Sequence, residues 1–213
     1  MTREEILKKA KPILFNTDMV RAIMDGRKTV TRRCVKQNVE PILNSPYHKE
    51  HPEVSDKQII SKVCMPPYQH GDILYVRETF KRNMDGYGGI DFGGYIYKAD
   101  CRSGFKDNYN PRHPSIHMPK EAARIFLKVK DVRMERLQDI TTDETIKEGI
   151  YQSSCNNCNA TFGCDICPDE GYDEINKFVE TWDSTIKKKD LDRYGWDANP
   201  WVWVIEFERM KVE

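Results

Sequence analysis

A helix, a glycine and a strand follow one another near the amino terminus, and this order constrains the fold more than any other feature. Asn16 and Thr17 offer N-cap side chains for a helix through Asp25, in which apolar residues recur at helical spacing. Gly26 follows where the helix has to end, since glycine readily takes a positive φ. The β-branched run over residues 29–33 favours a strand. Lys28 therefore falls in the joint between a helix and a strand.

The remaining patterns predict an α+β fold. Strands are expected at residues 12–15, 73–78, 95–98, 122–134 and 201–208, and further helices at 141–148 and 172–186. Residues 1–10 are interpreted as a polar lead-in, and loops are expected at 35–70 and 103–119. This order lacks a regular βαβ alternation, which argues against a doubly wound sheet. We expect a small mixed β-barrel or curled sheet with peripheral helices.

Length and charge limit the classes of protein that remain. The 213 residues suit one domain, 1–213, with insertions at about 35–67 and 152–170. Lys plus Arg equals Asp plus Glu at 34 each, so the net positive field of a protein that coats nucleic acid is missing. The longest apolar run, residues 201–205, is too short to span a bilayer, and the first residues lack a secretory signal. We therefore expect a cytoplasmic protein without a membrane partner.

Four of the seven cysteines fall close together near residue 160. They form two C-x-x-C pairs, Cys155 with Cys158 and Cys164 with Cys167. This is the spacing of a tetrahedral four-cysteine zinc site, whose closed set of thiolate ligands makes the metal structural. The alternative is four free thiols in a disordered loop. His113 and His117 lie beside prolines in another loop, and we assign them no metal.

The segment after Gly26 also predicts a ligand site. It places Lys28, then Thr31 three residues on, among arginines. These side chains could bind an anionic or nucleobase-bearing ligand. They could also activate the threonine as a nucleophile for acyl transfer. On a regular strand, residues three apart face opposite sides, so Lys28 and Thr31 converge only if the backbone turns near Lys28. The alternative is an ordinary strand with a solvated basic edge, and Glu78 paired with one of its cations.

Several motifs together resemble the ASCH domain of the PUA-like superfamily. They are Gly26-x-Lys28-x-x-Thr31-x-Arg33, Gly71-Asp-Ile-Leu-Tyr-Val-Arg-Glu78 and the strand that begins Arg124-Ile-Phe-Leu-Lys-Val. Two further segments, 114–119 and 194–204, resemble ASCH proteins of bacteriophages and prophages. The resemblance covers residues 11–34, 68–150 and 172–209 and implies a PUA-like barrel with a cleft around the Gly-x-Lys segment.

The resemblance also implies a function for that cleft. The family is proposed to bind RNA or a nucleoside, and its small bacterial N4-acetylcytidine amidohydrolases use a lysine, a threonine and a glutamate. By position these fall on Lys28, Thr31 and Glu78. A lysine serves as a base when burial or cationic neighbours lower its pKa.

Other residues are candidates for holding the ligand. The arginines can act as cationic neighbours or stabilise an oxyanion, and an aromatic ring can stack on an unpaired base. The candidate ligand-binding residues are Arg27, Arg32, Arg33, Tyr75 and Trp196. We expect a nucleoside or single-stranded RNA as the partner, with hydrolysis of an N-acylated base as a possible activity. The alternatives are a non-catalytic RNA-binding module and a phage accessory protein that binds another protein through the insertions.

The cysteine spacing generates the first testable prediction. Metal analysis of the purified protein is expected to find about one equivalent of zinc per chain, because four thiolates complete one tetrahedral site. Far less than one equivalent would refute the four-cysteine site.

Overall fold

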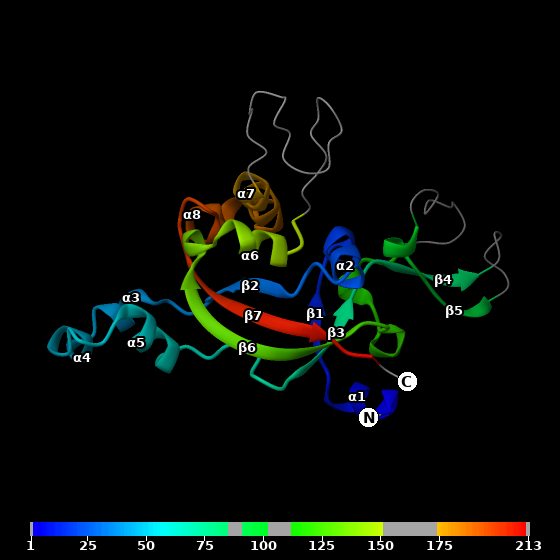
Figure 1. Cartoon of the computed structure of the whole chain (residues 1–213), viewed down its shortest axis with the longest axis horizontal. Coiled ribbons are helices and arrows are strands. Elements are labelled where there is room, and N and C mark those ends of the chain that lie inside the picture. Colours follow the sequence, from blue (N-terminus) through cyan, green and yellow to red (C-terminus); the bar gives the residue numbers. More distant parts are fainter. Residues whose placement is uncertain (1, 85–90, 102–111, 151–173, 212–213) are drawn as a thin grey trace, which may run out of the picture. The chain divides into compact units, whose positions relative to one another are not determined.

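Five strands form one mixed sheet, and two more form a separate hairpin (Figure 1). The computed structural model describes residues 2–84, 91–101, 112–150 and 174–211. The sheet order is β1-β3-β6-β7-β2, in which β1 runs parallel to β3 and the other registered pairs are antiparallel. The strands are β1 (Lys11–Leu14), β2 (Val30–Cys34), β3 (Ile73–Arg77), β6 (Phe126–Arg136) and β7 (Trp201–Arg209), with β4 (Phe80–Met84) and β5 (Asp91–Tyr97) in the hairpin.

The contacts divide the chain into two units. The first contains Met1–Thr29, His70–Lys130 and Phe207–Glu213, and the second contains Val30–Gln69 and Asp131–Glu206. Strands β6 and β7 each pass from one unit into the other. That the chain is a single domain stays a prediction.

The first unit holds the amino-terminal elements around an apolar cluster. Helix α1 (Arg3–Lys9) was expected to be a polar lead-in, but Thr2 and Glu5 form a capping box that begins a helix, and Ile6 is buried. Helix α2 (Thr17–Met24) begins as predicted, with the side chain of Asn16 accepting from the Met19 N–H. Ile6 joins Tyr75, Phe80 and Phe126 in the apolar core of this unit, and short 3-10 turns at Lys98–Asp100, Ser115–His117 and Lys120–Ala122 complete it.

The second unit packs helices on β2 and β7. Helix α6 (Thr142–Lys147) begins at the predicted Thr141 capping box, and α7 (Glu174–Thr185) buries Phe178 and Trp182. These side chains form a core with Val202 and Val204 of β7, and Figure 1 shows both helices beside these strands. Helix α8 (Leu191–Tyr194) and 3-10 turns at Leu137–Asp139 and Lys188–Asp190 lie in the same unit.

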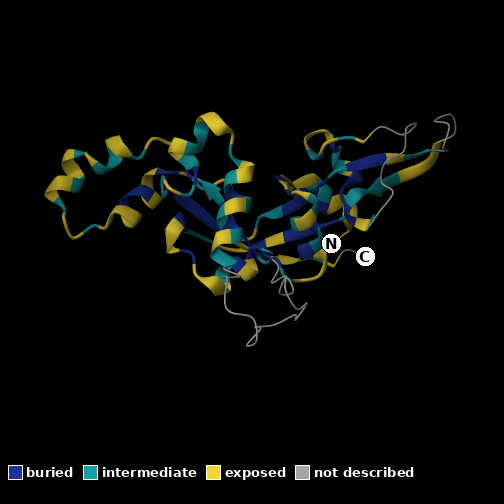
Figure 2. Ribbon diagram, turned by 90° about the horizontal axis from the view of Figure 1, so that it is seen from above, coloured by how far each residue is buried: buried dark blue, intermediate teal, exposed yellow. Residues whose placement is uncertain are grey.

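The segment 35–67 differs from the prediction of a long irregular insertion. It contains three short helices, α3 (Glu40–Leu43), α4 (Pro46–Glu50) and α5 (Asp56–Val63). Proline stands in the first turn of α3 and of α4, where its missing N–H costs no intrahelical bond. Ile59 and Ile60 of α5 are buried, whereas most of these helical residues are exposed or intermediate (Figure 2).

The sheet also corrects part of the predicted architecture. The α+β class is confirmed, but the strand order is open in the described residues, with β1 and β2 at its ends, so the sheet is not a closed barrel. Closure of a barrel requires the end strands to pair with each other. None of the helices in the described part of the chain is long and apolar enough to cross a membrane.

The joint between α2 and β2 generates a prediction. Gly26 has a φ of 77°, and a Cβ built there meets no heavy atom within 4 Å, so backbone conformation alone penalises a side chain. Gly26→Ala is expected to lower the free energy of unfolding by about 1 kcal/mol, measured by chemical denaturation. Gly26→Asn is the matched variant and should lose less, because asparagine tolerates this region better. An alanine variant as stable as the parent would contradict this account.

Candidate functional site

Charged side chains are buried in both units, which is uncommon for lysine, arginine and glutamate. In the first unit, Lys28 is 2% exposed and Glu78 is 1% exposed. In the second unit, Arg32 is 2% exposed. Buried ionisable groups are kept either for ion-pair networks or for function, and their surroundings distinguish the two.

Lys28 lies where the chain leaves the glycine turn of the first unit. The backbone N–H groups of Arg27 and Lys28 both donate to the carbonyl of Ala22, which holds the turn against α2. The Lys28 Nζ is 5.4 Å from the ring centroid of Phe15. The Phe15 N–H in turn donates to the carbonyl of Arg77. Through Phe15, Lys28 is thus connected to the residue that precedes Glu78.

Glu78 follows the end of β3 and pairs with Arg124. The Arg124 Nε lies 2.8 Å from Glu78 Oε1 and its Nη2 lies 3.0 Å from Oε2, which is a two-pronged ion pair. The Arg124 Nη1 also lies 2.6 Å from a carboxylate oxygen of Asp100. The Arg124 guanidinium lies 3.9 Å from the ring centroid of Tyr97. Arg124 is therefore held from several sides.

A second arginine fixes the turn that carries Asp100. The Arg21 Nε donates to the carbonyl of Ala99 at 2.9 Å, and its Nη2 donates to the carbonyl of Cys101 at 2.8 Å. Since Arg21 belongs to α2, the helix that precedes the Lys28 turn also orients the partner of Arg124.

The surroundings of Glu78 change its acidity. Burial raises the pKa of the Glu78 carboxyl above its ordinary value, although the hydrogen bonds and charge of Arg124 oppose this effect. The carboxyl consequently holds a proton to a higher pH than an exposed glutamate does. Such a group is suited to accept and release protons.

Thr31 and Arg33 belong to β2 in the second unit. Thr31 is 1% exposed, and its Oγ1 accepts a hydrogen bond of 2.9 Å from Arg33 Nη1. The same Arg33 nitrogen donates to the backbone carbonyl of Arg32. A hydroxyl that accepts from a guanidinium can still donate its own proton, so a nucleophilic role remains chemically available to Thr31.

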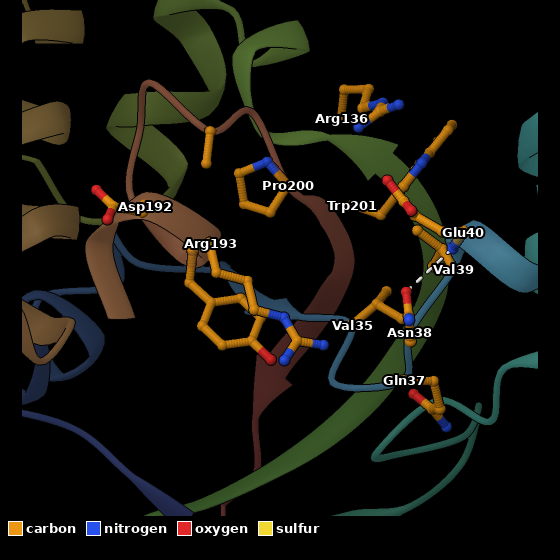
Figure 3. A pocket seen from close by; sticks show the side chains of 12 residues that line it. Val35, Gln37, Asn38, Val39, Glu40, Arg136, Asp192, Arg193, Pro200 and Trp201 are labelled. Carbon is orange, nitrogen blue, oxygen red and sulfur yellow. Dashed lines mark hydrogen bonds between the residues drawn. The ribbon is translucent and has the colours of Figure 1, made fainter. Parts of the chain in front are cut away.

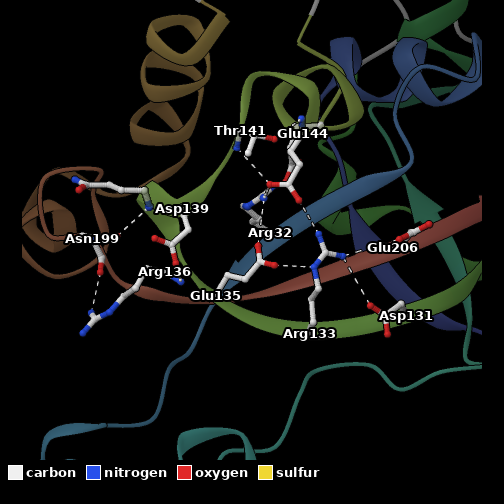
Figure 4. A network of polar contacts seen from close by, with 12 residues as sticks. Arg32, Asp131, Arg133, Glu135, Arg136, Asp139, Thr141, Glu144, Asn199 and Glu206 are labelled. Carbon is white, nitrogen blue, oxygen red and sulfur yellow. Dashed lines mark hydrogen bonds and ion pairs between the residues drawn. The ribbon is translucent and has the colours of Figure 1, made fainter. Parts of the chain in front are cut away.

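Arg32 lies in a network of carboxylates (Figure 4). Its guanidinium lies 2.7 Å from Glu144, 3.1 Å from Glu148 and 3.6 Å from Glu135. Arg133 extends the network to the other oxygen of Glu144 and to Glu135, each at 2.7 Å. Burial alone would raise the pKa of Glu144, but the nearby Arg32, the backbone N–H of Thr141 and Arg133 together lower it. In this structure Arg32 therefore joins β2 to β6 and α6.

The other predicted ligand residues each have partners within their own unit. The Arg27 Nη2 lies 3.0 Å from a carboxylate oxygen of Asp25. Tyr75 is buried in the core of the first unit, with the Lys120 Nζ 5.4 Å from its ring centroid. Trp196 packs edge-on against Phe178 in the core of the second unit, with ring centroids 6.2 Å apart. Arg27 and Tyr75 belong to the first unit, and Trp196 belongs to the second.

The predicted zinc ligands Cys155, Cys158, Cys164 and Cys167 lie outside the described residues. Within the described ranges, no group of three or more His, Cys, Asp or Glu side chains is arranged to hold a metal ion. Cys34, Cys64 and Cys101 are free thiols. Burial raises the pKa of the Cys34 thiol to about 11, partly opposed by Arg33, so Cys34 is a protonated thiol at neutral pH.

A pocket opens in the second unit beside the start of β7 (Figure 3). Its volume is about 480 Å³, and Val35, Pro200 and Trp201 contribute apolar surface. In Figure 3, Arg193 lies on one side, while Asn38 and Glu40 lie on the opposite side. Arg136 also lines the pocket, and its guanidinium lies 4.3 Å from the ring centroid of Trp201.

Comparisons of the chain with protein-family models, with curated proteins and with solved structures find no match. Membership of the ASCH family stays a prediction.

Sequence reasoning did not select Arg124 and Asp100 beside Glu78, or Arg136 and Arg193 at the pocket. Arg124 stood out only as the first residue of a strand motif, and Asp100 carried no signal because its role depends on a contact between residues 24 apart. A charged residue directly before an apolar run was the available hint for Arg124. Arg136 and Arg193 could be found only from their stacking on rings in the folded chain.

The carboxylate network generates a prediction about stability. Arg32→Met is expected to lower the free energy of unfolding by about 3 to 5 kcal/mol, because it leaves buried carboxylates without their cation. Arg82→Met is the matched control, since Arg82 pairs with Asp91 with a side chain that is 62% exposed. The control should change stability by about 1 kcal/mol or less. Equal losses in the two variants, measured by urea denaturation, would show that Arg32 does not hold the second unit together.

Proposed function

We propose that this protein is an ASCH-type, PUA-like protein that binds a nucleoside or an unpaired nucleotide of RNA, and that it hydrolyses an N-acylated base such as N4-acetylcytidine. The observation that carries the proposal is the burial of Lys28 and Glu78 within one unit, connected through Phe15 and Arg77. The raised pKa of Glu78 supports a proton-transfer role for this carboxyl.

In this proposal the residues keep the roles that the resemblance implies. Lys28 Nζ accepts the proton of the Thr31 hydroxyl while Thr31 Oγ1 bonds to the acyl carbon. The C–N bond then breaks, and the leaving amine nitrogen of the base takes the proton held on Lys28 Nζ. Water, oriented by Glu78, hydrolyses the acyl ester and restores the threonine. Arg33 donates to Thr31 Oγ1, and in the proposed reaction it stabilises the negative charge that develops on the oxygen of the acyl carbonyl.

Turnover of N4-acetylcytidine tests the proposal. We expect release of acetate and cytidine by the parent protein, and a loss of kcat of at least about 100-fold in Lys28→Met and in Thr31→Ala, because general-base and nucleophilic steps contribute at least this much. The measurement is chromatographic separation of cytidine from its acetylated form.

Two buried residues of the same types supply matched controls. Lys81→Met changes another buried lysine, and Thr145→Ala removes a threonine hydroxyl that donates to the carbonyl of Thr142. Both should retain turnover if they fold, as checked by denaturation. No turnover of any acylated nucleoside by the folded parent protein would exclude the hydrolase.

A non-catalytic RNA-binding module is the second candidate function. It is favoured by the hydrogen bonds that the candidate catalytic groups already make within the protein. Both oxygens of Glu78 accept from Arg124, and the Thr31 hydroxyl accepts from Arg33. Side chains fixed in this way can position a ligand without reacting with it.

This second candidate predicts binding that depends on local charge. Single-stranded RNA should bind with an affinity that falls as salt rises, and Arg33→Ala should weaken it by about 10-fold, because one guanidinium contact is lost. The control is Arg82→Ala, which changes an exposed arginine of the hairpin. Filter binding at several salt concentrations measures the affinity of both variants for single-stranded RNA. Equal affinities of the two variants would show that Arg33 does not contact the RNA.

A further inference from the structure

The pocket beside β7 has chemistry that the proposed reaction does not use. Its lining comes entirely from the second unit, and its volume of about 480 Å³ lies in the range of small-molecule sites, about 300 to 1,000 Å³. Val35, Val39 and Pro200 provide apolar contact, while Asn38 and Glu40 provide polar groups on one side (Figure 3). The pocket can therefore hold a ligand that is partly apolar and partly hydrogen-bonding.

Two guanidinium groups at the pocket each lie against an aromatic ring. Arg136 lies 4.3 Å from the ring centroid of Trp201, and Arg193 lies 5.0 Å from that of Tyr194. The contact that the structure gives for the Arg193 guanidinium is the Tyr194 ring, and Arg136 uses one donor on the carbonyl of Asn199. Both guanidiniums thus keep donors for an anion, and their planar faces and the rings are the surfaces on which nucleobases stack.

A residue that lines the pocket carries a buried donor. Trp201 is 8% exposed, and its indole Nε1 has no hydrogen-bond partner among the residues that the structure describes. By contrast, the Nε1 of Trp182 in the same unit donates to the carbonyl of Tyr194 at 2.8 Å. Buried polar atoms without a partner are uncommon in native proteins and call for an explanation. A base carbonyl that enters the pocket would supply the acceptor once Arg136, which lies over the ring, moves aside.

The geometry points to a second nucleotide site in this pocket, which takes one pyrimidine nucleoside monophosphate unit, either free or unpaired in RNA. The base lies against the Tyr194 ring and its carbonyl accepts from the Trp201 indole N–H, while the phosphate contacts Arg193. Glu40 and Asp192 balance the two arginines, so the pocket suits one phosphate group better than a polyphosphate. This inference rests on the proposed function, that the chain binds nucleotides.

The test is a titration of the full nitrogen-15-labelled protein with cytidine 5′-monophosphate, followed by NMR. The chain has four tryptophans, and Trp201→Phe identifies the Trp201 indole signal. We expect that signal to shift on titration, while the indole signal of Trp182, which already has an acceptor, changes less. A Trp201 signal that does not move at saturation would overturn the inference.

Affinities of variants provide the second arm, with cytidine 5′-monophosphate and a short oligocytidylate as probes. Trp201→Phe and Arg193→Gln should each weaken binding by about 5-fold to 10-fold, the loss of one hydrogen bond or charged contact. Arg82→Gln is the control for the loss of an exposed arginine. Binding of the monophosphate alone identifies a site for free nucleotides, and binding of the oligonucleotide alone identifies a site for RNA; each supports the inference.

The two proposals fail in different ways. If Lys28→Met loses affinity for the two cytidine probes while Trp201→Phe and Arg193→Gln keep it, the nucleotide binds in the first unit. That result would overturn only the second site. Loss in the pocket variants without any turnover of acylated nucleosides would support the second site and exclude the hydrolase. No binding of either probe at low salt would overturn the second site, whatever the result for turnover.

Discussion

Burial of the Arg32 guanidinium among three carboxylates is the interaction on which the second unit depends. A charge removed from water is tolerated when opposite charges surround it, and here the two terminal nitrogens of Arg32 face Glu135 from β6 and Glu144 and Glu148 from α6 and its carboxyl end. The Arg32 Nε has no acceptor among the described residues. Glu144 also accepts from the backbone N–H of Thr141 at the start of α6. One ion-pair network thereby fixes both the beginning of the helix and its position on β2 and β6. The same requirement orients β2, the strand that carries Thr31.

In the first unit the buried group is a carboxyl, that of Glu78, and its pKa is shifted in the opposite direction from that of Glu144. Glu78 meets Arg124, and burial still raises its pKa, whereas the carboxyl of Glu144 beside Arg32 has a lowered pKa. A lowered pKa means that the folded state favours the carboxylate, so Glu144 adds stability at neutral pH and this contribution is lost as the pH falls. A raised pKa has the reverse sign, and ionisation of Glu78 reduces stability as the pH rises. Glu144 therefore stabilises the folded state at neutral pH, whereas the raised pKa of Glu78 supports the proton-transfer role that we propose for it.

Local sequence signals predicted the elements that local interactions determine. The Asn16 cap, the positive φ of Gly26 and the Thr141 capping box are interactions within a few residues, and each is confirmed. The helices at 35–67 were missed because each is a short segment among prolines, and β4 was missed because the polar residues 81–83 interrupt its pattern. In the site, the sequence indicated Lys28 and Glu78. Their environments follow from contacts between distant segments, which no local pattern encodes.

We propose that this chain, which has no net charge, binds a nucleotide through locally arranged groups that include Lys28 and Glu78. A crystal structure of the full chain with N4-acetylcytidine or cytidine tests this most directly. The account predicts electron density for the nucleoside within hydrogen-bonding distance of Lys28 Nζ or Glu78, with Arg124 still on the carboxylate. A fully occupied nucleoside elsewhere, with Lys28 and Glu78 packed only against protein, would contradict it.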